Sequence, residues 1–140
     1  MFGWKNRQTH VLRPGVMGAG VYLAYIYAPA LSPLKILQLV TITTGAVAAH
    51  ATEIAPVVLT DRGAAGAGST VVATNTNDSD VTTAAATRTK SGAYAAKTPF
   101  VNNFEDNPYE LAAGNVLEVS FDPATADPEM TINIVTAEGD

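Results

Sequence analysis

Cysteine is absent from this 140-residue chain, and charge is scarce in it. Without cysteine the chain can form no disulfide, no thiolate zinc site and no cysteine nucleophile. Charged residues make up 15% of the sequence, against about 25% in an average globular domain. Alanine, threonine and glycine fill the space instead. A surface with so little charge is typical of a chain that copies of itself or partners largely cover.

Each end of the chain also lacks charge of one sign. No acidic residue precedes Glu53, and no basic residue follows Lys97. Exposed charges are screened within about 10 Å at ordinary salt, so a free monomer gains little from this sorting. In an assembly, a basic arm can lie on the acidic face of a neighbour. We therefore expect an assembling protein, the alternative being chance and a solvated acidic face. The net charge of −5 argues against a nucleic-acid partner.

Long apolar helices are also missing. Between Arg13 and Lys35 no residue is charged, and this stretch is long enough to span a bilayer. However, its glycines together with Pro29 and Pro33 would break a spanning helix into short pieces. A cleaved leader ending near Ala49-His50-Ala51 is a second alternative. We expect neither, and therefore no membrane partner.

Residues 1–18 are expected to form an extended N-terminal arm, followed by one domain over residues 19–140. Neither a period of two nor a helical period persists across the arm, and Pro14-Gly15 is a break. Aromatic side chains there would serve as buried anchors and cations would meet acidic patches. The candidate partner-binding residues are Phe2, Trp4, Lys5, Arg7 and Arg13.

The domain is expected to be all-β. Short strand-like runs alternate with turns rich in glycine, proline and asparagine, which is typical of a β-sandwich or jelly roll. Along the last two runs, Leu117 to Phe121 and Met130 to Ile134, every second residue is expected to face the core. Residues 81–97 fit either a strand or a short helix. The expected strands are 20–28, 35–44, 54–60, 69–74, 116–121 and 130–136.

No pattern in the sequence predicts catalysis or a cofactor. The glycine-rich run from Gly63 to Thr70 has Gly68 where a phosphate loop has lysine. His10 and His50 lack a nucleophile motif, and two histidines without cysteine supply a zinc site poorly. Glu118 and Asp122 form a carboxylate pair without aromatics to stack a sugar. We expect no enzyme, no metal and no cofactor.

Two loops carry oxygen ligands that calcium would accept. Asn75 and Asn77 lie in one, with Asp78 and Asp80, and the second contains Asp122, Asp127 and Glu129. Neither loop has the spacing of an EF-hand or its terminal glutamate. We expect solvated turns at both places.

The segment Tyr109-Glu110-Leu111-Ala112-Ala113-Gly114-Asn115-Val116-Leu117-Glu118-Val119 resembles the turn and strand of small jelly-roll proteins on tailed-phage particles. A strand like 37–43, the apolar strand 56–60 and the run 69–74 after a glycine-rich hairpin resemble the same group. The resemblance covers residues 35–136. Asn115 replaces the usual aspartate, and both suit the turn.

That resemblance implies a capsid decoration (cement) protein or head-fibre base of a bacteriophage. The chain would be a homotrimer on the capsid exterior of the virion, binding the major capsid protein and stabilising the particle without catalysis. One alternative is a receptor- or carbohydrate-binding module of a phage fibre or tail, and another is a minor tail structural subunit. An exposed cluster of aromatic side chains would favour the binding module. The aromatic residues available for such a cluster are Tyr94, Phe100, Phe104 and Tyr109.

Overall fold

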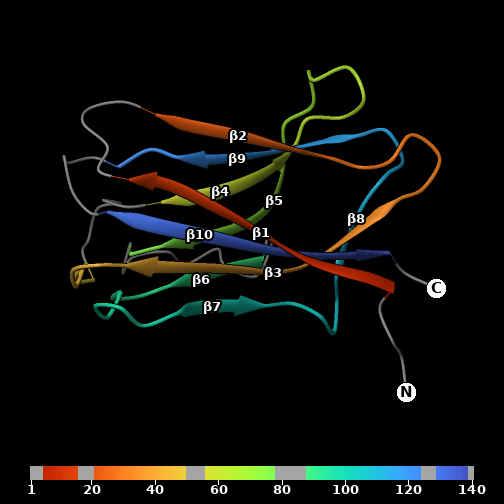
Figure 1. The fold of residues 1–140 in the computed structure, drawn as a ribbon. Coiled ribbons are helices and arrows are strands. Elements are labelled where there is room, and N and C mark those ends of the chain that lie inside the picture. The colour runs from red at the N-terminus through yellow and green to blue at the C-terminus, as the bar shows by residue number, and fades with distance from the viewer. Residues whose placement is uncertain (1–4, 16–20, 50–55, 78–87, 124–128, 139–140) are drawn as a thin grey trace.

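A computed structural model shows an all-β protein whose strands form two sheets packed face to face. Figure 1 shows most of one sheet above the other, with the first and last strands side by side. The structure describes residues 5–15, 21–49, 56–77, 88–123 and 129–138. The all-β prediction is therefore confirmed.

The first sheet has the strand order β1-β10-β3-β7, and β8 also pairs with β3. β10 lies between β1 and β3, so the two ends of the chain are neighbours in the sheet. β7 and β8 follow each other along the same edge of β3. The strands are β1 (Lys5–Gly15), β3 (Leu34–Thr43), β7 (Phe100–Asn103), β8 (Tyr109–Leu111) and β10 (Met130–Glu138).

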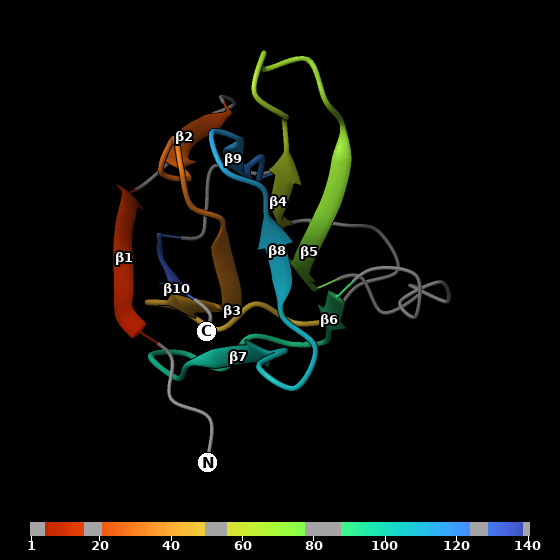
Figure 2. The same ribbon diagram turned by 90° about the vertical axis from the view of Figure 1, so that its right-hand side faces the viewer.

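The second sheet has the strand order β2-β9-β4-β5-β6. All its pairs are antiparallel except β5 with β6. Figure 2 shows β1 and β2 as edge strands on the same side of the sandwich. The strands are β2 (Tyr22–Tyr27), β4 (Val57–Asp61), β5 (Thr70–Thr76), β6 (Arg88–Ser91) and β9 (Val116–Phe121).

One apolar core fills the space between the sheets. The alternation predicted for β9 and β10 is confirmed, because Leu117, Val119 and Phe121 are fully buried and so are Ile132 and Ile134. Their polar neighbours point away from the core. The expected turn between β4 and β5 is also present, with Gly63 and Gly66 at positive φ.

A bulge in β3 explains why both of its faces are apolar, as the sequence indicates. Val135 pairs with Gln38 but Thr136 pairs with Ile36, so Leu37 has no partner in the ladder. The side chain of Ile36 consequently joins the main core, whereas Leu37 packs outside it with Val135 and Ala137. One strand thus supplies two apolar clusters.

The expected arm is largely a strand of the sandwich. Residues 5–15 pair with β10 along their length as β1. Two register shifts interrupt this pairing, and Asn6 has a φ of 52°. These irregularities hide the period of two in the sequence. The expected division of the chain at residue 18 therefore does not match the strand pairing.

The expected loop at residues 75–80 also needs correction at its start. Asn75 and Thr76 belong to β5, and Asn77 is as fully buried as they are. Pro56 immediately precedes β4, which lies between β9 and β5 in the second sheet, so this proline marks the start of a central strand. Residues 81–87 of the ambiguous segment 81–97 lie outside the described residues, whereas residues 88–91 form β6.

Candidate functional site

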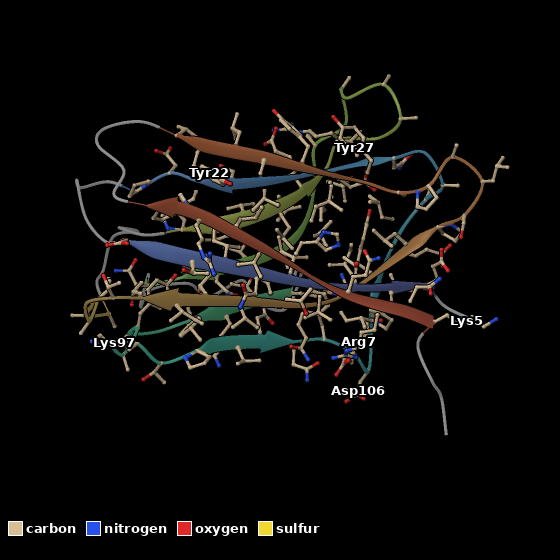
Figure 3. The ribbon with its side chains drawn as sticks, in the orientation of Figure 1. Lys5, Arg7, Tyr22, Tyr27, Lys97 and Asp106 are labelled. Carbon is tan, nitrogen blue, oxygen red and sulfur yellow. The ribbon has the colours of Figure 1, made fainter. Side chains whose placement is uncertain are left out.

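The predicted partner-binding cations lie on β1. Lys5, Arg7 and Arg13 are all exposed, whereas Phe2 and Trp4 lie outside the described residues. Arg7 pairs with Glu105, which follows β7 at the opposite edge of the same sheet. Hydrogen bonding to Arg7 lowers the pKa of Glu105. Figure 3 shows Lys5 and Arg7 at the end of β1 where the chain begins. Arg7 is thus already engaged within its own chain.

The sorting of charge along the sequence has an intramolecular counterpart. Arg7 pairs with Glu105 and Lys35 pairs with Glu110, and each pair joins the basic N-terminal part to the acidic C-terminal part. Lys5 lies opposite Glu138 in the ladder between β1 and β10. The topology brings opposite charges side by side because early strands pair with late ones. Assembly is therefore not needed to explain the sorting.

An exposed apolar strip runs along edge strand β2. Val21, Leu23, Tyr25 and Tyr27 are 52%, 47%, 48% and 67% exposed, and we call these four residues the β2 strip. Tyr22, Ala24 and Ile26 alternate with them and pack against the core. Figure 3 labels Tyr22 and Tyr27 at the two ends of the strand. The strip is an exposed apolar surface that the sequence alone does not single out.

A cleft of about 190 Å³ opens between the edges formed by β1 and β2. Ile26, Pro29 and Leu34 supply its apolar lining. Its polar lining contains His10, whose Nε2 lies 2.9 Å from Thr136 Oγ1 and whose pKa is lowered by burial. The remaining lining residues are Asn6, Gln8, Tyr27 and Glu138. Polar groups beside one exposed tyrosine suit a small hydroxylated ligand.

A polar cluster closes the end of the sandwich where β4 ends. Asp61 accepts hydrogen bonds from Tyr109 Oη at 2.6 Å, from the backbone N–H of Gly63 at 2.8 Å and from Asn115 Nδ2 at 3.3 Å. The Asp61 side chain thereby ties together β4, β8 and the turn before β9. This arrangement is structural, because every contact joins elements of the sandwich.

Tyr109 provides a prediction for alkaline pH. Burial and the hydrogen bond to Asp61 raise its pKa from 10.0 to about 12. A raised pKa stabilises the fold fully below pH 10 and loses that effect as the pH rises toward 12. In a tyrosinate absorbance titration, we expect Tyr109→Phe to reduce the amplitude of the late ionisation step by that of one tyrosine. Tyr27→Phe, at an exposed site, is the control and should leave the late step in place.

The remaining sequence candidates do not form a catalytic or metal site among the described residues. Glu118 forms an ion pair with Arg62 at 2.9 Å, and Asp122 is exposed. Asn75 and Asn77 donate hydrogen bonds from their side-chain amides to backbone carbonyls, those of Leu39 and Ala48 respectively. Asp78, Asp80, Asp127 and His50 lie outside the described residues. Within the described ranges no group of three or more acidic or histidine side chains is placed to hold a metal ion.

The aromatic residues considered for an exposed binding cluster lie mostly inside the molecule. Tyr94 and Phe104 are buried in the core, and Phe100 packs edge-on against Tyr94 with ring centroids 4.6 Å apart. Arg88 lies over the rings of Phe104 and Tyr109. The exposed tyrosines of the molecule are instead Tyr25 and Tyr27. Their alternation with buried residues in an uncharged run is the sequence signal that could have identified them.

The chain matches no known protein family, no curated protein and no solved structure in the comparisons made. The part of the chain that the structure describes also has no helix with the length and apolarity needed to cross a bilayer. The fold and the exposed surfaces described above are therefore the features that bear on function.

Proposed function

We propose that this chain is a structural protein of a virus particle, a jelly-roll decoration (cement) protein that binds the outer surface of the capsid. It would act without catalysis, by contacting the major capsid protein across subunit junctions and resisting expansion of the particle. The single observation that carries this proposal is the strand order. The resemblance of residues 35–136 to phage decoration proteins supports it.

The strand order supports a jelly roll in particular. Two sheets with the orders β1-β10-β3-β7 and β2-β9-β4-β5 place the first and last strands side by side, and β2 beside β9. The eight strands of a jelly roll, formed by two Greek keys, are connected in this way, and viral capsid and lectin domains commonly use that fold. β8 extends the β7 position, and β6 is an added edge strand. Because one fold hosts many functions, the particle-binding role is tested directly.

The partner-binding contact is proposed to include Phe2 and Trp4, the aromatic anchors of the N-terminal segment, together with the exposed Lys5 and Arg13. Arg7 contributes less in this proposal because it already pairs with Glu105. Many copies bound to one particle would add avidity to a modest single-site affinity. The resemblance implies trimers, and self-association of some form fits the exposed β2 strip.

The test is co-sedimentation of the purified protein with capsids that lack it. We expect the wild type to sediment with the capsids. The double variant Phe2→Ala/Trp4→Ala should bind about 30-fold more weakly or worse, since buried aromatic anchors dominate interface energies. Val71→Ala, which trims an exposed apolar side chain on β5, is the matched control and should bind as the wild type does.

A wild-type protein that stays in the supernatant would contradict the particle-binding proposal. Binding retained by the double variant would instead contradict the role of the two aromatics. The alternative function, carbohydrate binding, is favoured by one observation, the cleft beside Tyr27 with its polar lining. Glycan binding that Tyr27→Ala abolishes, in a protein that ignores capsids, would establish that alternative.

A further inference from the structure

β2 is the least protected edge among the described strands. It pairs with β9 on one side only, with no register shift, and has no charged residue and no proline within its six residues. Natural sheets normally protect an edge with charge, proline, bulges or short length, since a regular apolar edge recruits another strand. The other edges of the described sandwich are protected: β1 by bulges and cations, β6 by Arg88 and Lys90, and β7 and β8 by their shortness.

The backbone N–H and C=O groups of the β2 strip point to the side of β2 away from β9. Ala28 N–H donates to Asn115 O, so Ala28 and Asn115 form a hydrogen-bonded pair in the register of β2 with β9. Antiparallel pairs alternate between bonded and non-bonded. The even-numbered residues of β2 are therefore bonded to β9, while the N–H and C=O groups of Leu23, Tyr25 and Tyr27 point outward. The same residues have exposed side chains and backbone groups that pair with none of the described strands.

The β2 strip exposes a large apolar area. The strip and Leu31, which is 97% exposed in the loop after β2, together expose roughly 600 Å² of mainly apolar surface when a large side chain counts for 150 to 250 Å². Two copies paired edge to edge would cover the part of this surface nearest the contact, because cross-strand side chains on one sheet face touch each other. A monomer rarely leaves a patch of this size uncovered.

Charge also favours a second copy over an unrelated partner. The chain carries −5 overall, yet no residue between Arg13 and Lys35 is charged. Next to Tyr25 on the same face, Glu118 is neutralised by Arg62. Two identical chains can therefore approach along β2 without like charges facing each other at the contact, although their overall charges repel. An uncharged, self-complementary strand edge fits a copy of itself.

We propose that two copies of this chain join through antiparallel pairing of their β2 strands, about a two-fold axis beside Tyr25. Leu23 of each copy then lies opposite Tyr27 of the other, and the two Tyr25 residues face each other. The second sheets of the two copies become one continuous sheet. Such an isologous contact closes on itself as a dimer. This inference does not depend on the particle-binding proposal.

The test is the mass of the protein in solution over a range of concentrations, measured by sedimentation equilibrium. We expect a dimer in equilibrium with monomer. Tyr25→Lys places two like charges face to face at the axis, and it should raise the dissociation constant about 100-fold or more. Val71→Lys and Val101→Lys, at sites 40% and 38% exposed on other strands, are the matched controls and should dimerise normally. Circular dichroism checks that each variant is folded.

A charge-swap experiment locates the axis. Tyr25→Glu alone should also be monomeric, whereas an equimolar mixture of Tyr25→Lys and Tyr25→Glu should recover a heterodimer, because residue 25 meets residue 25. A wild-type monomer, a wild-type trimer, or a dimer unchanged by Tyr25→Lys would each overturn the proposal. So would a mixture that fails to recover the dimer. Capsid binding is measured separately, so failure of either proposal leaves the other standing.

Discussion

Replacing Asn75 by aspartate is expected to lower the free energy of unfolding by about 4 kcal/mol, the largest effect we expect from a single isosteric change. Asn75 is fully buried on β5. Its Nδ2 donates to Leu39 O at 3.2 Å, to Thr41 Oγ1 at 3.3 Å and to Phe100 O at 3.3 Å. This amide therefore connects the second sheet to β3 and β7 of the first. A carboxylate of the same shape would face those oxygens without a proton to donate.

The effect of Asn75→Asp should depend on pH in a definite direction. Burial and the facing oxygens raise the pKa of the introduced carboxyl above its value in the unfolded chain. The folded state then binds the extra proton more tightly, so the loss of stability is relieved as the pH falls and grows as the pH rises. Urea denaturation at several pH values measures this slope.

Asn75→Ala is the matched control for this prediction. It removes the donor without adding charge, and should cost about 2 kcal/mol with little dependence on pH. Equal losses for the two variants at neutral pH, or a pH-independent loss for Asn75→Asp, would show that the amide does not bridge the sheets as described.

Deleting residues 1–15 is expected to destabilise the protein severely, on the order of 5 kcal/mol, or to make it insoluble. The deletion removes β1, its ladder with β10 and the half-buried side chains of Leu12 and Pro14. β10 would become an exposed edge strand with the core beside it. Thermal unfolding monitored by circular dichroism, together with the soluble yield, measures the loss.

Deletion of residues 1–4 is the control, because β1 begins at Lys5. It removes Phe2 and Trp4 while keeping the strand, and we expect unfolding close to that of the full chain. A stable, soluble protein after deletion of 1–15 would mean that β1 is a detachable arm, as the sequence alone indicates. Because removal of residues 1–15 deletes β1, substitution of Phe2 and Trp4 tests particle binding more cleanly than removal of the whole segment.

The strands with a clear period of two were predictable from the sequence. β9 was predicted residue for residue, and β10 starts where expected, since Met130, Ile132 and Ile134 alternate with polar residues. β1, β7 and β8 were not predicted. β1 is interrupted by two register shifts, and β7 and β8 have four and three residues, too few to show a period. Tertiary pairing with β3 and β10, rather than local sequence, makes these segments extended.

The candidate surfaces were predictable only in part. The uncharged stretch that contains β2 was visible in the sequence, but its position at a sheet edge depends on pairing with β9, nearly a hundred residues later. The charge sorting was visible too, yet the pairs Arg7–Glu105 and Lys35–Glu110 depend on the topology. Asparagine is a residue type common in turns. Only the packing of the two sheets makes Asn75 a buried side chain that connects them.

The central place of β10 in the first sheet has a consequence for synthesis on the ribosome. β1 is made early but pairs only with β10, and β3 has β10 on one of its sides. β10 lies far from both partners in the sequence. The first sheet therefore cannot form completely until β10 has left the ribosome. Such non-local pairing forms slowly, and it leaves β1 without its sheet partner until β10 has been synthesised.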